Sequence, residues 1–182
     1  PLSYGRLAIK DDRGQLTVAS VDIAIISDTH MPRGTRALPA SCVARLRAAG
    51  LILHAGDIAT LNVLADLRTH GEVIAVYGNV DDAGVREALP PTVTVTVEGQ
   101  RIAMIHDAGP ARGRLERMRR RYPGADAVVF GHSHIPLHER APDGFQIFNP
   151  GSPTEKRRAP RHTMGIAHAE RGGVSFELVE LD

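Results

Sequence analysis

The chain is poor in cysteine, in aromatic side chains and in long apolar runs. Its 182 residues include one cysteine, Cys42, no tryptophan and 4% aromatic residues. One cysteine excludes an internal disulfide, and no apolar run approaches the length of a bilayer-spanning helix. We expect no signal leader, since the stretch before the first strand candidate does not combine a charged segment with an apolar one. We therefore expect a protein of a reducing compartment, the cytoplasm, without a membrane partner.

A surplus of charge of one sign is also absent. The 22 Lys and Arg residues nearly balance the 21 Asp and Glu residues, for a net charge of +1. A global attraction to nucleic acid is therefore not expected. The local exception is "ARGRLERMRRRYPG", residues 111–124. On a helix it places apolar and arginine residues on different faces, namely Leu115, Met118 and Tyr122, and Arg114, Arg117 and Arg121. We interpret the arginine face as solvated, with a surface for an anionic partner as the alternative.

Short apolar runs alternate with amphipathic stretches along the first two thirds of the chain, and 42% of all residues are apolar. Buried strands with polar carboxyl ends are predicted at Val21–Ser27, Leu51–Asp57, Glu72–Asn79, Arg101–Asp107 and Asp126–His132. Helices are predicted at 39–49 and 60–70, each followed by glycine. This alternation predicts one α/β domain with its site at the strand ends.

Other segments indicate antiparallel strands. The stretch "TVTVTVEGQRIAMIH" alternates around a Glu-Gly-Gln turn and predicts a hairpin. Runs without a convincing helix follow His134, at 135–140, 144–149, 163–168 and 174–181, so we expect two sheets rather than one. Residues 1–20 are an N-terminal extension, with a hairpin expected around Asp12 to Gly14, and residues 21–182 form the single domain.

Polar residues at the predicted strand ends form one set. They are Asp28, His30, Asp57, Asn79, His106, His132 and His134. All are ligand types for a divalent metal, and seven are too many for one ion. Two ions about 3.5 to 4 Å apart need a bridging carboxylate, for which Asp57 is the candidate. The mixed oxygen and nitrogen donors favour Mn, Fe, Co, Ni or Zn over Ca or Mg.

The motifs "SDTH", "HAGD", "YGNVDD", "IHD" and "GHSH", followed by "NPGS" at 149–152, resemble the series of the calcineurin-like metallophosphoesterase superfamily. More narrowly, the chain resembles its small bacterial and archaeal phosphodiesterases, from about Val21 onward. The resemblance implies a four-layer α/β/β/α sandwich with two mixed β-sheets. It implies that one ion takes Asp28, His30, Asp57 and His134, and that a second takes Asp57, Asn79, His106 and His132.

The implied function is a metal-dependent phosphodiesterase in which a hydroxide bridging two ions attacks a small phosphodiester or nucleotide-type substrate. Manganese is our first choice of metal. We expect catalytic roles for Asn79, Asp81 and His106, with Asp81 acting behind the ligands unless it is a plain turn residue. Phosphate contacts are expected at Asn149, Ser152 and Arg157, with a Pro-Gly turn and a solvated basic loop as the alternative.

Two positions depart from the family pattern. Val80 stands where many members carry a histidine that protonates the leaving oxygen, a contribution worth about 10² to 10⁴ in rate. This predicts substrates whose leaving group departs unprotonated, or another acid, for which His54 is the nearest candidate in sequence. Asp107 stands where glycine is common, and is expected either to hold the ring of His106 or to repel an anionic substrate.

Two other function classes stay open. The retromer scaffold subunit resembles the same fold, so a non-catalytic binding protein is the main rival, which Val80 supports. A nuclease would need a basic groove beside the metals, for which the arginine-rich segment is the only support. Edge strands of the two sheets leave assembly into a homo-oligomer open.

Overall fold

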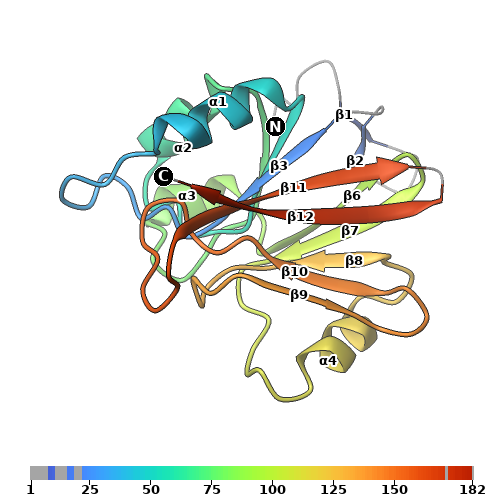
Figure 1. The fold of residues 1–182 in the computed structure, drawn as a ribbon. Coiled ribbons are helices and arrows are strands. Elements are labelled where there is room, and N and C mark those ends of the chain that lie inside the picture. Colours follow the sequence, from blue (N-terminus) through green and yellow to red (C-terminus); the bar gives the residue numbers. More distant parts are fainter. Residues whose placement is uncertain (1–7, 11–15, 19–21, 171, 182) are drawn as a thin grey trace.

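The computed structural model describes residues 8–10, 16–18, 22–170 and 172–181, which form two packed β-sheets with helices outside them (Figure 1). The smaller sheet has the order β12 (Gly173–Leu181), β11 (His162–Glu170), β3 (Ile23–Ile26), β4 (Leu51–His54) and β5 (Glu72–Ala75). The larger sheet has the order β1 (Ala8–Lys10), β2 (Leu16–Val18), β6 (Thr92–Val97), β7 (Gln100–Ile105), β8 (Ala127–Val129), β10 (Gln146–Asn149) and β9 (Leu137–Arg140). Both sheets mix parallel and antiparallel pairs. The expected sandwich of two mixed sheets is confirmed.

Helices cover the outer face of each sheet. They are α1 (Ala40–Ala48), α2 (Leu61–Arg68), α3 (Ala83–Ala88) and α4 (Arg114–Arg121). Residues of α1, α2 and α3 form one apolar cluster with the smaller sheet, and α4 contributes Met118 to a cluster on the larger sheet. Within the part of the chain that the structure describes, none of these helices has the length and apolar composition needed to cross a membrane.

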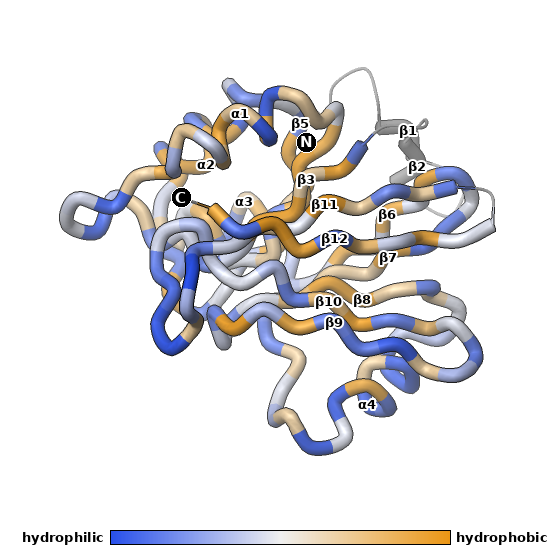
Figure 2. The backbone as a smooth tube through the Cα atoms, viewed as in Figure 1, coloured by the Kyte–Doolittle hydropathy of each residue, from blue (hydrophilic) through white to orange (hydrophobic). Residues whose placement is uncertain are grey.

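The central strands are apolar throughout because both of their faces are buried. Ile23 and Ile25 of β3 pack into the cluster between the sheets, whereas Ala24 and Ile26 pack toward the helices. Figure 2 shows these apolar strands at the centre and hydrophilic residues in the outer loops. In sheets buried on both faces, polar residues gather where the strands end, at their carboxyl ends.

Most predicted elements between residues 39 and 106 are found. The helices predicted at 39–49 and 60–70 are α1 and α2, and the hairpin is β6 with β7, turning at Glu98 and Gly99. Both turn residues have positive φ, 49° and 82°, as tight hairpin turns require. Helix α3 was not predicted, although Asp82 caps it by accepting a hydrogen bond from the amide of Val85 at 2.8 Å.

The N-terminal extension continues the larger sheet. Strand β1 pairs antiparallel with β2, and β2 pairs parallel with β6. The turn expected at Asp12 to Gly14 lies outside the described residues. The pairing of the two hairpin strands is therefore observed, whereas the turn between them stays a prediction.

Two arginines of α4 donate hydrogen bonds to the loop that precedes the helix, so they do not face only solvent. Arg114 donates to the carbonyl of Gly109 through Nε at 3.1 Å and Nη2 at 2.9 Å. Arg117 donates from Nη2 to the carbonyls of Ala108 and Pro110, both at 2.6 Å. The interpretation of a merely solvated arginine face is therefore wrong for these two residues.

Candidate metal centre

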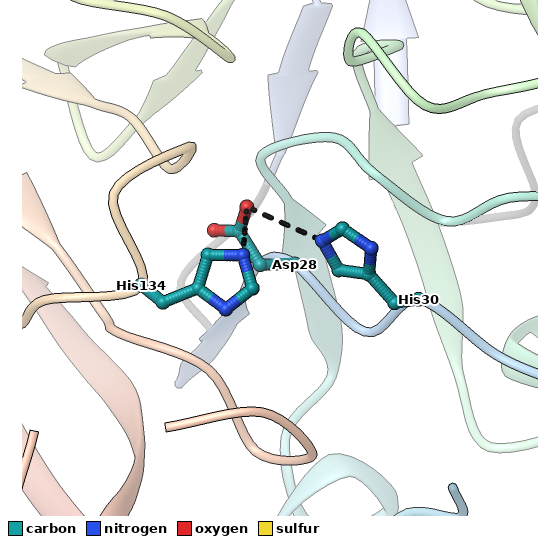
Figure 3. A group of neighbouring side chains, drawn as sticks. All are labelled: Asp28, His30 and His134. Carbon is teal, nitrogen blue, oxygen red and sulfur yellow. Dashed lines mark ion pairs between the residues drawn. The ribbon is translucent and has the colours of Figure 1, made fainter. Parts of the chain in front are cut away.

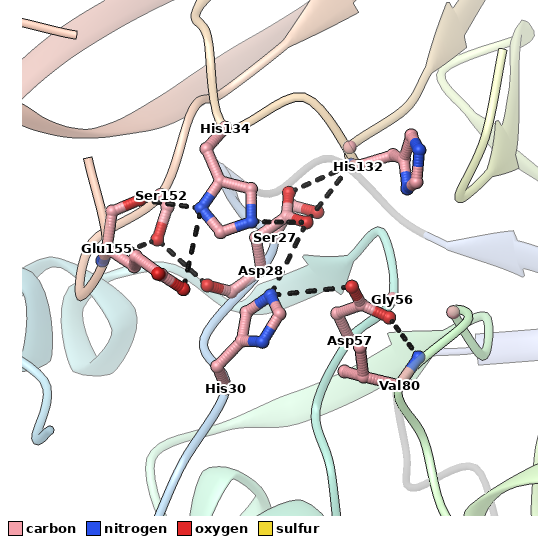
Figure 4. Close-up of polar contacts among 12 residues, drawn as sticks. Ser27, Asp28, His30, Gly56, Asp57, Val80, His132, His134, Ser152 and Glu155 are labelled. Atoms are coloured by element: carbon pink, nitrogen blue, oxygen red, sulfur yellow. Dashed lines mark hydrogen bonds and ion pairs between the residues drawn. The ribbon is translucent and has the colours of Figure 1, made fainter. Parts of the chain in front are cut away.

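The predicted ligands follow the ends of strands β3, β4, β5, β7 and β8. Figure 4 shows Asp28, His30, Asp57, His132 and His134 among them. Five of them have positive φ, between 46° and 68°, namely Asp28, His30, Asp57, His132 and His134. Non-glycine residues rarely adopt this conformation, and such strain is typical of functional sites. The backbone turns sharply at each ligand, which aims side chains from different strands at common points.

The first group of donors is deeply buried and comprises Asp28, His30 and His134 (Figure 3). Nε2 of His134 lies 3.4 Å from Oδ1 of Asp28, and Nε2 of His30 lies 3.9 Å from the same oxygen. Nδ1 of His134 is 2.6 Å from the carbonyl of Glu155, so it must donate there and leave Nε2 as a lone-pair donor. Nε2 of His134 and both ring nitrogens of His30 have no hydrogen-bond partner among the described residues.

The second group lies at the open side of the site and comprises Asn79, His106 and His132. Oδ1 of Asn79 is 3.0 Å from Nε2 of His106 and 2.9 Å from Nδ1 of His132. Nδ1 of His106 donates to the carbonyl of Ala55 at 2.8 Å, which again leaves Nε2 toward the centre. Asn79 and His132 are exposed, whereas His106 is 5% exposed.

Asp57 lies between the two groups. Its Oδ2 atom is 3.4 Å from Nε2 of His30 and 3.3 Å from Nε2 of His106. Its other oxygen, Oδ1, accepts a hydrogen bond from the amide of Val80 at 2.9 Å. One carboxylate oxygen therefore faces donors of both groups, which is the position that a bridging ligand needs.

The spacing of the donor atoms fits metal coordination. Two donors each about 2.1 Å from one ion lie about 3.0 Å apart at a right angle and about 3.4 Å apart at the tetrahedral angle. Five of the donor pairs described above are 2.9 to 3.4 Å apart, and only the pair of His30 and Asp28 is wider. The residues present thus fit divalent ions on both sides of Asp57.

Electrostatics favour a cation at this position. Burial raises the pKa of Asp28 to about 7, and burial lowers the pKa of His30 and that of His134, the latter to about 4. Burial also raises the pKa of Asp57, but the hydrogen bond with His106 and the charge of its ring outweigh this effect and bring the value to about 2. Two imidazoles are therefore neutral near pH 7, as metal binding requires, beside a buried carboxylate that a cation would stabilise in its charged form.

Three motif glycines make room for the ligands. A Cβ atom on Gly131 would contact Ser27 Oγ and lie 2.8 Å from Oδ2 of Asp28, and one on Gly78 would overlap the side chain of Asp57. A Cβ on Gly56, whose φ is +93°, would lie 2.7 Å from Nδ1 of His106. The glycines of "HAGD", "YGN" and "GHSH" are thus explained by close packing against ligand side chains.

Asp81 lies behind the ligands and is buried. Its carboxylate accepts hydrogen bonds from the amides of Gly78 and Ala59, both at 2.6 Å, and from the amide of Asp57 at 3.2 Å. It ties the loop that carries Asp57 to the loop that carries Asn79, and it is 5% exposed. We therefore assign it a positioning role for these two ligands.

Replacing Asp81 by asparagine is expected to weaken metal binding by about 10- to 100-fold, because an amide has one acceptor oxygen for three donor amides. Titration calorimetry of the metal-free protein with Mn²⁺ measures this change in metal affinity. Asp82→Asn is the matched control, since asparagine caps α3 as well as aspartate does. Equal affinities in the two variants would contradict the assignment.

Two predicted phosphate contacts have other partners in the structure. Asn149 is fully buried, and its Nδ2 donates to the carbonyl of Gly131 at 2.8 Å. Ser152 is 1% exposed, and its Oγ donates to the carbonyl of Asp28 at 2.8 Å and accepts from the amide of Glu155 at 2.9 Å. Both side chains hold the backbone of the ligand loops, so their expected role in contacting phosphate is corrected to positioning.

Arg157 differs from these two because it lies at the open rim of the site. It is exposed, and its Nη1 donates to the carbonyl of His132 at 3.4 Å. Its guanidinium group keeps further donors for an anion beside the exposed ligands. Arg157 therefore stays a predicted phosphate contact.

The structure corrects two suggestions made from the sequence. His54 is fully buried, burial lowers its pKa to about 3, and its Nδ1 accepts from the amide of Gly56 at 3.2 Å while Nε2 pairs with Thr29 at 3.1 Å. It cannot protonate a leaving group. The carboxylate of Asp107 accepts from the amide of Gly109 at 2.7 Å, whereas the ring of His106 is held by a carbonyl.

Fold and donor set together define a metal-binding α/β/β/α sandwich with its centre between the sheets, and comparison with known proteins gives its family. Residues 21–172 match the family model described as the calcineurin-like phosphoesterase superfamily domain. The chain belongs to this superfamily. It is 35% identical over 139 residues to a probable metallophosphoesterase of Methanothermobacter thermautotrophicus, covering 74% of this chain and 78% of the relative. A probable metallophosphoesterase of Methanocaldococcus jannaschii is 33% identical, with 74% and 69% covered.

Solved structures with the same fold include Vps29 of Entamoeba histolytica, crystallised with Zn²⁺. It has a TM-score of 0.70 and 21% identity, and the match covers 88% of this chain and 99% of that one. A Thermotoga maritima protein has a TM-score of 0.69 and 28% identity, with the same shares covered. Phosphoester hydrolysis and divalent metal binding follow from the family at the general level, and the Vps29 likeness shows the fold.

Proposed function

We propose that the protein hydrolyses small phosphodiesters with two divalent ions held by the seven donor residues. The observation that carries the proposal is the place of Asp57, whose Oδ2 atom faces His30 on one side and His106 on the other. The ions, when bound, would lower the pKa of water to about 7 and neutralise the phosphoryl oxygens.

The residues of the chain divide the remaining work. Asp28, His30 and His134 are buried and shielded from solvent, so they would hold their ion rigidly. Asn79 and His132 are exposed, so the substrate must approach from their side. Arg157 stands at that rim and would bind a non-bridging phosphate oxygen. Phosphate binding at the open side would orient the phosphorus toward the metal centre for attack.

The donor set supports manganese as the first choice and zinc as the next, since carboxylate, amide and imidazole ligands suit both. Thiolate, the donor that would favour zinc, is not among the seven. The Entamoeba Vps29 structure contains Zn²⁺ on a similar fold, which keeps zinc in the comparison. Iron, cobalt and nickel suit the same ligands, so all five metals belong in the first assay.

The second candidate function is a non-catalytic scaffold. The observation that favours it is the likeness to Vps29, which includes a Chaetomium thermophilum structure in complex with a cyclic peptide, at 18% identity and a TM-score of 0.66. Val80 favours it as well, because a valine cannot give a proton to a leaving oxygen. A nuclease is less supported, since two arginines of the basic helix are used by the neighbouring loop.

Hydrolysis of bis(p-nitrophenyl) phosphate distinguishes these functions. Metal-stripped protein is resupplied with Mn²⁺, Zn²⁺, Fe²⁺, Co²⁺ or Ni²⁺, and p-nitrophenyl phosphate serves as the monoester comparison. We expect metal-dependent turnover of the diester and weaker turnover of the monoester. Protein that binds the metal, as shown by elemental analysis, and yet turns over neither ester would favour the scaffold.

A further inference from the structure

A pocket of about 310 Å³ adjoins the exposed side of the metal centre. Its lining includes the three donor residues Asn79, His106 and His132, together with Tyr77, Arg86 and Arg121. A phosphoryl group bound at the exposed donors therefore has one of its two ester groups directed into this pocket. The residues there decide which kind of ester group fits.

Arg86 is fixed in this pocket before any substrate arrives. Its Nε donates to the carbonyl of Asp81 at 2.8 Å and its Nη2 to the carbonyl of Asn79 at 2.7 Å. Its guanidinium carbon lies 5.4 Å from the centre of the Tyr77 ring. A guanidinium group has five N–H donors, so donors remain for an anion without further ordering of the side chain.

Arg121 is the second cation of the pocket. Unlike Arg114 and Arg117, it forms no hydrogen bond to the loop before α4 among the described residues, and its guanidinium carbon lies 5.7 Å from the ring of Tyr122. It is exposed and lies at the end of the helix. The arginine face predicted from the sequence thus supplies to this pocket a cation that has no ion pair within the described part of the chain.

One carboxylate opposes these two arginines. Asp107 also lines the pocket, with Oδ1 bound to the amide of Gly109. Two guanidinium groups against one carboxylate leave the lining positive. The pocket therefore suits an ester group that carries negative charge of its own.

The chemistry of the leaving group points in the same direction. An alcohol leaves as an alkoxide whose conjugate acid is about as weak as water, with a pKa near 15.7, and so needs an acid that Val80 cannot supply. A phosphate monoester leaves as a dianion whose conjugate acid has a pKa of about 6, and needs none. A pocket with two arginines, in which both histidines are metal donors rather than acids, fits the second kind of leaving group.

We propose that the substrates are phosphoanhydrides, in which two phosphoryl groups share a bridging oxygen, such as nucleoside diphosphate derivatives. This rests on the proposed function. Oxygen from water bonds to the phosphorus at the metal centre, and the bond from that phosphorus to the bridging oxygen breaks. The electron pair stays on the bridging oxygen, and the second phosphate leaves into the pocket of Arg86 and Arg121. The products are two phosphate monoesters, and when both are dianions the two protons of the water go to solvent.

The test compares three substrates on the Mn²⁺-loaded protein: ADP-ribose as the anhydride, adenylyl-(3′→5′)-adenosine as an alkyl diester, and bis(p-nitrophenyl) phosphate as a reference. We expect kcat/KM for the anhydride to exceed that for the alkyl diester by about 100-fold or more, the size of a general-acid contribution. In Arg121→Gln the ratio of anhydride to reference should fall by about 10- to 100-fold. Arg120→Gln, an exposed neighbour outside the pocket, is the matched control.

Binding gives a second readout that does not depend on turnover. Adenosine 5′-(α,β-methylene)diphosphate cannot be cleaved between its phosphorus atoms, and calorimetry should show that it binds more tightly than AMP. In Arg121→Gln the ratio of these two affinities should fall about tenfold. Turnover of the reference with no preference for the anhydride overturns this proposal alone. No turnover of the reference in metal-bound protein contradicts the proposed function itself.

Discussion

Replacing Asp57 by asparagine is expected to reduce diester hydrolysis by at least about 10³-fold, because it removes the carboxylate oxygen that faces His30 on one side and His106 on the other. The amide oxygen of asparagine carries no full charge and would bind one ion at most. Hydrolysis of bis(p-nitrophenyl) phosphate, measured together with the metal content of the purified variant, gives the effect. We expect the bound metal to fall from two ions to one or none.

The matched control for this variant is Asp66→Asn. Asp66 lies exposed on α2 and is not one of the donor residues, so activity and metal content should remain those of the parent protein. An Asp57→Asn protein that keeps two ions and its activity would show that Asp57 does not bridge them. Loss in both variants would indicate a general effect of charge on folding.

Gly78→Ala is expected to lower activity by about 10²-fold, although it adds one methyl group outside the metal ligands. The added Cβ would overlap the side chain of Asp57 and lie 2.6 Å from its amide nitrogen. Because φ at Gly78 is not positive, alanine fits the backbone and only space is lacking. Asp57 must shift, and a misplacement of about 1 Å at a reacting centre costs about 10²-fold in rate.

Kinetics and thermal unfolding of the metal-free protein separate these effects. Gly78→Ala should lose activity and metal affinity more than it loses stability. Gly172→Ala is the control, because among the described residues no atom beyond its chain neighbours lies within 4 Å of the added Cβ. Unchanged affinity for Mn²⁺ in Gly78→Ala would mean that the Asp57 loop tolerates displacement, and would weaken the explanation given for the motif glycines.

Much of the fold could be predicted because its signals are local in the sequence. Apolar runs that end in polar residues identified β3, β4 and β5, which are buried on both faces. The hairpin of β6 and β7 followed from strict alternation around a glycine turn. Helix α3 was missed because it is six residues long and its amphipathic pattern is too short to recognise.

The candidate site also has a part that the sequence predicts and a part that it does not. The donor residues are recognised by their chemical type and motif order, and the structure brings them together. Asn149 and Ser152 were assigned to phosphate because backbone and hydroxyl groups at a strand end suit an anion. Burial decides the partners of their side chains, and burial is a tertiary property. The suggestion that His54 is the general acid was wrong for the same reason, because its side chain is buried. Arg86 was missed because its role depends on carbonyls of the loop that precedes it, which no motif reveals.

Anomalous diffraction from crystals grown with Mn²⁺ tests the two-ion centre most directly. The account predicts two peaks about 3.5 to 4 Å apart, with Asp57 between them. One should lie beside Asp28, His30 and His134, and the other beside Asn79, His106 and His132. A single peak, or ions that do not contact Asp57, would contradict the two-metal assignment and the mechanism that depends on it.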